Sequence, residues 1–327
     1  MTTKAVTCAP ELSPLAEIGT DIAKAVSLLE KGQLVAIPTE TVYGLAGNAL
    51  NEHAVATIFQ VKNRPTFDPL IVHLSDKDQL AVYATEIPPK AERLMDRFWP
   101  GPLTLLLPKK SIIPDLVTSG LERAGFRCPN HTLAHQLLSR LNFPLAAPSA
   151  NPFGYISPTE AIHVENQLGD RIDYILDGGP CTVGVESTII GFESGEPIVY
   201  RLGGISLEEI ESVIGNIKIG SSTSKPAAPG QLESHYAPKK KMILGDVRAL
   251  MQQTKNQSYG ILSFDTDYRA PVQRILSPSG DTTEAARNLF RYMRELDSES
   301  VSVIFCEKVP DEGLGRAIND RLKRACA

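Results

Sequence analysis

The segment VKNRPTFDPLIVH, residues 61–73, places two cations just before an apolar run. Lys62 and Arg64 stand two positions apart, so in an extended segment their side chains point the same way. Two prolines hold the segment out of regular helix or sheet, and the closing apolar run predicts a buried strand that ends near His73. A rigid loop with paired positive charge suits a polyphosphate, although a solvated charged turn accounts for the same residues.

Length and composition indicate a globular protein of two domains. The chain has 327 residues, and domains commonly contain about 100–200 residues. Hydrophobic residues make up 42% of the chain and charged residues 22%, which is ordinary for a soluble fold. The net charge of -5 argues against non-specific binding of nucleic acid over the whole surface. A local basic cleft remains compatible with it.

Cysteine usage and hydropathy predict a cytoplasmic protein without a membrane partner. The five cysteines are scattered, odd in number and lack C-x-x-C spacing, so we expect reduced thiols in a reducing compartment. The N-terminus lacks the apolar core of a secretory signal, and no apolar run reaches the roughly 20 residues that span a bilayer. Cys128, His131 and His135 have loosely metal-like spacing, but without a second cluster we expect no zinc site.

Apolar runs and helical periodicity alternate up to about residue 220 and predict one mixed α/β domain. The expected strands include residues 34–37, 103–107, 174–176, 183–191 and 198–202, and the expected helices include 52–61, 90–98 and 159–168. Polar side chains stand inside these strands or at their ends, where binding residues are often found.

Several of these polar positions are candidate ligand contacts. Arg127 could clamp a carboxylate or phosphate bidentately, or be a surface arginine. Thr39 could bind a ligand or cap a strand-to-loop turn. Residues 144–154 combine small residues with hydrogen-bonding side chains, which allows close approach of a ligand, or they form a proline-rich connector. The buried polar run around Ser187 needs partners, either in the core or on a ligand.

The remainder of the chain predicts a linker and a second, smaller α/β domain. Residues 221–230 are small, polar and proline-rich, which is typical of a linker. We expect a catalytic domain at 15–220, a linker at 221–241 that carries His235 and Tyr236, and a second domain at 242–327. The chain has neither G-x-G-x-x-G after a strand of the second domain nor a Walker loop, so any use of ATP relies on another site.

Five motifs, taken in order, resemble those of the Sua5/YrdC family. They are PTETVYGL at 38–45, KNRP with PL at 62–65 and 69–70, PSAN at 148–151, DGGP with VEST at 177–180 and 185–188, and RLGG at 201–204. The linker and the second domain resemble the longer, two-domain Sua5 form. The resemblance implies a twisted mixed sheet of YrdC-like type with a large cationic cavity, a small Rossmann-like C-terminal domain, and a linker across the cavity mouth.

The resemblance also implies an activity, that of threonylcarbamoyl-AMP synthase, a nucleotidyltransferase. Such an enzyme joins L-threonine, bicarbonate and ATP, with Mg²⁺, into threonylcarbamoyl-adenylate and pyrophosphate. The product feeds the downstream tRNA threonylcarbamoyl-transfer machinery that modifies adenosine 37. We expect positioning and charge stabilisation rather than a covalent intermediate. No residue is an evident general base; His73 is a candidate, but first a substrate contact.

Family positions carry over residue by residue. Lys62 and Arg64 fall at the catalytic contacts to the ATP phosphates. The other implied ATP-site residues are Ala147, Ser149, Asn151, Ser157, Arg201 and Tyr236, and the implied threonine-side residues are Thr39, His73, Arg127 and Ser187. One departure is Gln231-Leu232-Glu233-Ser234, which replaces more basic and aromatic residues and puts the linker's hold on the phosphates in doubt.

Two other functions compete with this one. A non-catalytic RNA-binding module with a basic concave face could use Lys62, Arg64, Arg127 and Arg201. The cations alternate with small hydroxyl residues and lack interleaved exposed aromatics, which favours the enzyme; direct tRNA binding stays open. A carbamoyl-transfer domain that uses carbamoyl phosphate lacks support, because the chain has neither an acylphosphatase-like segment nor zinc-finger cysteines.

Overall fold

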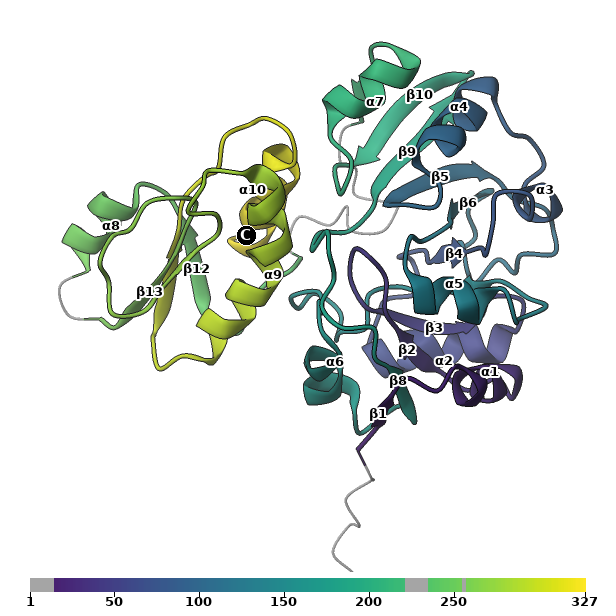
Figure 1. Ribbon diagram of the computed structural model, residues 1–327, viewed down its shortest axis with the longest axis horizontal. Coiled ribbons are helices and arrows are strands. Elements are labelled where there is room, and N and C mark those ends of the chain that lie inside the picture. Colours follow the sequence, from purple (N-terminus) through teal and green to yellow (C-terminus); the bar gives the residue numbers. More distant parts are fainter. Residues whose placement is uncertain (1–14, 221–234, 255–256) are drawn as a thin grey trace, which may run out of the picture.

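The computed structural model describes residues 15–220, 235–254 and 257–327. The predicted linker therefore lies mostly outside the described residues, as does its departure at 231–234. Within the described part, two separate sheets are covered by helices (Figure 1). None of the described helices is long and apolar enough to cross a membrane.

The larger sheet is built from short strands joined by helices. Its strands are β1 Glu17–Gly19, β2 Val35–Ile37, β3 Gly44–Asn48, β4 Ile71–His73, β5 Leu103–Pro108, β6 Arg123–Arg127, β7 Leu145–Ala146, β8 Tyr174–Leu176, β9 Thr188–Glu193, β10 Glu196–Arg201 and β11 Lys218–Ile219. Its helices are α1 Ile22–Glu30, α2 Glu52–Lys62, α3 Leu80–Tyr83, α4 Pro89–Phe98, α5 Thr132–Leu138, α6 Ala161–Leu168 and α7 Leu207–Ile214. Asp21 caps α1, because its side chain accepts the Lys24 N–H at 3.1 Å.

The strand order of the larger sheet is β1-β8-β2-β3-β7-β4-β6-β5-β9-β10-β11, with parallel and antiparallel neighbours mixed. Its central strands are buried and apolar, and β4, β5 and β6 contribute Val72, Leu105 and Phe126 to one core cluster. Strand register then decides which polar ends meet. His73 is opposite Arg127, and Arg127 is opposite Thr104 on β5. The sheet therefore aligns polar residues of three neighbouring strands.

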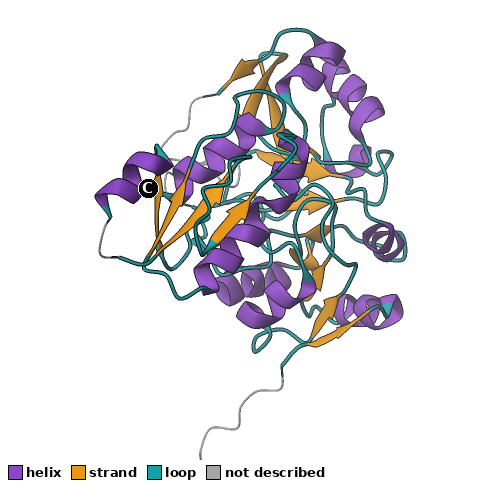
Figure 2. Ribbon diagram, turned by 60° about the vertical axis from the view of Figure 1, so that its left-hand side comes forward, coloured by secondary structure: helices purple, strands orange, loops and turns teal. Residues whose placement is uncertain are grey.

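The smaller sheet is parallel, in the order β12-β15-β13-β14. Its elements are β12 Lys241–Leu244, α8 Val247–Gln253, β13 Tyr259–Ser263, β14 Gln273–Ile275, α9 Thr282–Ser298, β15 Val303–Cys306 and α10 Gly315–Ala325. Figure 1 shows α9 and α10 on the side of this sheet that faces the larger domain, and Figure 2 shows the helices and strands of the molecule from a second direction. The expected α/β architecture, a large mixed sheet and a second smaller one, is confirmed.

Two local predictions were wrong. Lys62 is the last residue of α2, and Asn63 caps that helix in the left-handed region with φ 51°, so the two cations do not share an extended segment. Strand β9 begins only at Thr188, so Glu186 and Ser187 belong to the loop before it. The shared reason is local: helical periodicity continues through Lys62, and the apolar residues around Glu186 mimic a strand. The sequence analysis also did not anticipate α8 and β14.

Candidate active site

A cavity in the larger domain brings together polar residues from distant parts of the chain. Nine of the predicted site residues line it: Thr39, Arg64, His73, Arg127, Ala147, Ser149, Ser187, Arg201 and Tyr236. The cavity encloses about 560 Å³, with solvent at its mouth included.

Arg127, at the end of β6, lines this cavity and forms an ion pair with Glu40. Its Nη2 lies 2.9 Å from Glu40 Oε1, and both side chains are almost fully buried. The pair lacks hydrogen-bond geometry, so Nε and Nη2 of Arg127 have no hydrogen-bond partner among the described residues. Buried polar groups are nearly always hydrogen-bonded in a working state. Arg127 is ion-paired but not hydrogen-bonded through these two nitrogens, and its planar guanidinium suits a carboxylate ligand.

His73 is held neutral beside this arginine. Burial, assisted by the positive charge of Arg127, lowers the pKa of His73 to about 3. Its Nδ1 lies 3.1 Å from the carbonyl oxygen of Ile71, so this nitrogen carries the proton and donates it to that carbonyl. A group with such a low pKa is a weak general base at neutral pH. The surroundings of His73 therefore favour a contact role over proton transfer.

The hydroxyl groups near the cavity are already engaged with protein atoms. Thr39 Oγ1 donates to Val42 O at 2.6 Å and accepts two backbone N–H bonds, so it caps the loop as well as lining the cavity. Ser187 Oγ lies 2.7 Å from Thr104 Oγ1. Arg201 at the end of β10 donates to both the carbonyl and the hydroxyl oxygen of Ser187 at 3.0 Å. These contacts fix the shape of the wall.

Lys62 lies behind the cavity wall and is not among the residues that line it. Its Nζ donates to the carbonyl oxygens of Ser149 and Asn151, each at 2.5 Å, and its side chain is buried. Burial lowers the pKa of Lys62, and the charge of Arg64 adds to this effect. In this structure the ammonium group fastens the loop that carries Ser149.

Arg64 lines the cavity while closing its own loop. Its Nη2 lies 2.9 Å from Asp68 Oδ2, and its guanidinium donates to the carbonyl oxygens of Asp68 and Pro69. Because both partners are buried, the loop is held as a rigid unit. The guanidinium carbon is also 5.8 Å from the ring centroid of Phe153.

Asn151 and Ser157 stand outside the cavity lining but shape the nearby loop. Asn151 Nδ2 donates to the carbonyls of Pro152 and Tyr155, at 2.9 and 2.8 Å. Ser157 Oγ donates to Glu186 Oε1 at 2.6 Å. Both side chains are buried and act on the loop rather than on the cavity in this structure.

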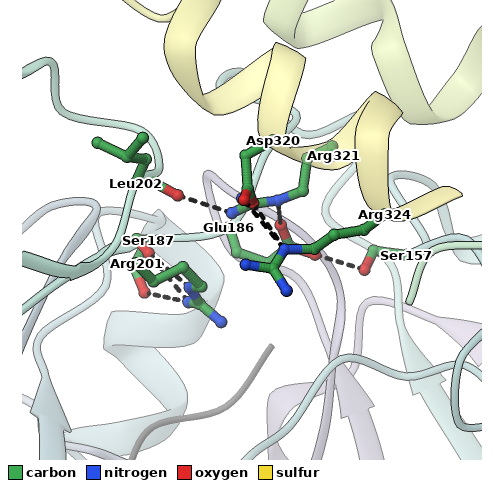
Figure 3. Close-up of polar contacts among 8 residues, drawn as sticks. All are labelled: Ser157, Glu186, Ser187, Arg201, Leu202, Asp320, Arg321 and Arg324. Atoms are coloured by element: carbon green, nitrogen blue, oxygen red, sulfur yellow. Dashed lines mark hydrogen bonds and ion pairs between the residues drawn. The ribbon is translucent and has the colours of Figure 1, made fainter. Parts of the chain in front are cut away.

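Glu186 and His235 line the cavity, although the sequence did not single them out as site residues. Burial acts to raise the pKa of Glu186, but the charges of Arg321 and then Arg201 outweigh it and hold that pKa below its usual value. Figure 3 shows Arg321 reaching Glu186 from α10 of the smaller domain. The motif around Glu186 was a usable signal, whereas Arg321 lies in an amphipathic helix with no local mark of a role.

Tyr236 forms part of the cavity wall from the segment just before the smaller domain. Its ring stacks on Phe290 of α9 with centroids 5.4 Å apart, and the guanidinium carbon of Arg321 lies 5.1 Å from its centroid. Its backbone has φ 65°, which a bulky residue adopts only where its surroundings impose it. Packing by the smaller domain thus holds Tyr236 at the cavity.

Metal-binding side chains do not gather in the described part of the chain: it contains no group of three or more His, Cys, Asp or Glu placed to hold an ion. Cys128, His131 and His135 are among the described residues and form no such group.

Comparison with known proteins assigns both parts of the chain. The Sua5/YciO/YrdC family model, described as "Telomere recombination", matches residues 27–203, and the model "Threonylcarbamoyl-AMP synthase, C-terminal domain" matches residues 205–327. The threonylcarbamoyl-AMP synthase of Pyrococcus abyssi is 43% identical over 92% of both chains. That of Bacillus subtilis is 41% identical over 93% of this chain and 92% of its own.

A solved structure shares the whole architecture. The crystal structure of P. abyssi Sua5 complexed with L-threonine has a TM-score of 0.88 and 41% identity, and covers 93% of this chain and 94% of its own. Likeness at this level extends over both sheets and the described residues between them. The chain therefore belongs to the Sua5/YrdC family, in the two-domain form that carries the Sua5 C-terminal domain.

Proposed function

We propose that the cavity joins L-threonine, bicarbonate and ATP into threonylcarbamoyl-adenylate, with release of pyrophosphate. The chain is a threonylcarbamoyl-AMP synthase that serves the t6A modification of tRNA, as its full-length relatives are. The observation that carries the proposal for this cavity is the guanidinium of Arg127, whose Nε and Nη2 make no hydrogen bond to described residues, in the same cavity as Arg64 and Arg201. One cation can hold an amino-acid carboxylate while the others face phosphates.

On the threonine side, Arg127 binds the carboxylate of L-threonine through Nε and Nη2, which make no hydrogen bond to described residues. The solved P. abyssi relative holds L-threonine. Thr39, His73 and Ser187 surround the same region and contact the small polar substrate. Neutral His73 adds no positive charge near the amine, which must be uncharged to react.

On the nucleotide side, Arg64 and Arg201 face the triphosphate, and Ala147, Ser149 and Tyr236 form the wall around the nucleoside. Three arginines and one carboxylate, Glu186, line the cavity, which supports its proposed cationic character. The nucleotide side is supported from outside the cavity lining by Lys62, Asn151 and Ser157.

The chemistry needs positioning more than proton transfer. The threonine amine attacks the carbon of bicarbonate, and loss of water leaves a carbamate. A carbamate oxygen then attacks the α-phosphorus of ATP; the bond to the bridging oxygen breaks, and pyrophosphate leaves with the electron pair. Arg64 and Arg201 stabilise the charge that builds on the leaving group, and the shared cavity removes the entropic cost of bringing three reactants together.

Mg²⁺ enters this proposal with ATP rather than at a protein site. Mg²⁺ commonly keeps several waters and binds substrate phosphates, and the described residues offer no ligand cluster of their own.

We also propose that the chain consists of a catalytic domain at 15–220, a linker at 221–241 and a C-terminal domain at 242–327. Pairing of β11 with β10 supports including residues up to 220 in the catalytic domain. The all-parallel sheet with helices against it supports a Rossmann-like C-terminal domain. The product would pass to the tRNA threonylcarbamoyl-transfer machinery.

An equilibrium titration separates this function from an RNA-binding module. The proposal predicts that L-threonine strengthens ATP binding to the full chain, because the two ligands share one cavity. A module would instead bind RNA tightly with a steep salt dependence, and ATP would leave that binding unchanged. An affinity for ATP that does not change when L-threonine is added would count against the proposal.

A further inference from the structure

Arg321 is a fully buried charged residue at the contact between the two domains. It stands on α10 of the smaller domain, and its side chain has no solvent exposure. Its Nε lies 2.9 Å from Glu186 Oε2, and its Nη2 donates to Leu202 O at 2.8 Å, both in the larger domain (Figure 3). A fully buried guanidinium of this kind is stable only if its partners are well placed.

Two contacts of Arg321, Glu186 and Tyr236, are parts of the cavity wall, whereas its other partners, Leu202 and Asp320, are not. Glu186 lines the cavity with one carboxylate oxygen on Arg321 and the other on the hydroxyl of Ser157. Tyr236 also lines the cavity. The guanidinium of Arg321 lies over its ring, and the ring stacks on that of Phe290. One side chain of the smaller domain thus touches two wall residues of the larger domain's cavity.

A second arginine of the smaller domain reaches the same loop. Arg294 on α9 donates through Nε to Ser157 O at 3.2 Å and through Nη2 to Ile156 O. The backbone of Ser157 is therefore held from α9, while its hydroxyl is held through Glu186 from α10. The smaller domain fixes the loop behind the nucleotide side of the cavity at two points.

We propose that Arg321 is a positioning residue through which the C-terminal domain sets the affinity of the cavity for ATP. It orients Tyr236 by its charge over the ring and orients Glu186, and with it Ser157, by a charge-assisted hydrogen bond. The threonine side, around Arg127 and His73, lies on strands of the larger sheet and does not contact Arg321. This inference rests on the proposed assignment of Tyr236 to the nucleotide.

The test compares two arginines of the same helix. In Arg321→Met the buried charge is lost at similar length. In Arg316→Met a partly exposed ion pair with Glu208 is lost, which also joins the two domains but lies away from the cavity. Pyrophosphate release by the full chain gives KM for ATP, KM for L-threonine and kcat separately.

We expect Arg321→Met to raise KM for ATP about tenfold or more, with KM for L-threonine changed less than about twofold. Arg316→Met should leave both KM values near those of the wild type, because exposed ion pairs contribute little. Equal effects of the two variants, or an unchanged KM for ATP in folded Arg321→Met, would overturn the proposal. An inactive wild-type chain would instead refute the proposed function itself.

If Arg321→Met does not fold, a double variant that also removes the charge of Glu186 tests the proposal. Glu186→Gln combined with Arg321→Met removes both buried charges, so the uncompensated carboxylate no longer opposes folding. Glu186→Gln alone measures the effect of that change on ATP. A double variant with a higher KM for ATP than Glu186→Gln alone supports positioning by Arg321. Equal values would mean that Arg321 only neutralises Glu186, and the proposal would fail.

Discussion

Gly184 of the larger domain lies against the backbone of α9, and replacing it with alanine tests the contact between the domains. A Cβ at this position would lie 2.5 Å from Arg287 Cα and 2.6 Å from the carbonyl oxygens of Ala286 and Arg287. These are backbone atoms of a helix, so no side-chain rotation relieves the overlap. The adjacent Val185 packs in the same core cluster as Tyr236.

A matched control separates this overlap from backbone strain. Gly184 has φ +81° and Gly195, in the turn between β9 and β10, has φ +82°, but a Cβ at Gly195 would meet nothing within 4 Å. Either alanine variant should lose roughly 1–2 kcal/mol from the left-handed backbone. Gly184→Ala should lose about 1–3 kcal/mol more, because overpacking at a rigid contact forces the backbone to shift.

Urea-induced unfolding of the full chain, followed by circular dichroism, measures both losses. A titration with ATP in the presence of L-threonine should also show weaker ATP binding in Gly184→Ala, since displacement of α9 moves Phe290 and with it Tyr236. Equal urea midpoints for Gly184→Ala and Gly195→Ala would refute the reasoning, because the domains would then not be packed rigidly at this point.

Three further predictions concern single side chains. Burial lowers the pKa of His73 and His235 to about 3 and that of His163 to about 4, so the unfolded chain binds more protons below its histidine pKa of about 6.5. The free energy of unfolding should have its full value above about pH 6.5. It should fall as the pH drops towards about 4, by up to about 1.4 kcal/mol per pH unit for each histidine. Urea midpoints at several pH values check this, and His73→Asn should reduce the slope while exposed His53→Asn should not. Lys62→Met should lower the free energy of unfolding by about 2–5 kcal/mol, because two buried carbonyls lose their donor; unchanged stability together with lost synthesis would return Lys62 to a direct phosphate role. Arg127→Lys should raise KM for L-threonine about tenfold or more through loss of the bidentate fork, whereas the same change at exposed Arg140 should have no effect; a selective effect on ATP would contradict the assignment.

Local sequence patterns predicted much of the fold and most of the cavity wall. Periodicity located α2 and α4 within one residue, because each helix has a buried face and ends at a recognisable cap or proline. Arg127 and Arg201 were recognisable as cations at the ends of short extended segments, and strand register aligns these ends through Thr104 and Ile189. Sequence reasoning of this kind succeeds where the neighbours along the chain decide the structure.

Residues whose role depends on distant partners were not predictable in this way. The inward position of Lys62 depends on carbonyls 87 and 89 residues away. Arg321 depends on Glu186, 135 residues earlier and in the other domain. Nothing in the residues beside either one distinguishes a buried cation from a solvated one, since lysine and arginine are exposed in most contexts.

Pyrophosphate release from ATP is the most direct measurement of the proposed reaction, with identification of the adenylate by mass. The full chain with Mg²⁺ should release pyrophosphate only when L-threonine and bicarbonate are both present, and threonylcarbamoyl-adenylate should form in equal amount. Omission of either substrate should remove both products. Pyrophosphate release that continues without L-threonine, or that yields AMP without the adenylate, would contradict the account.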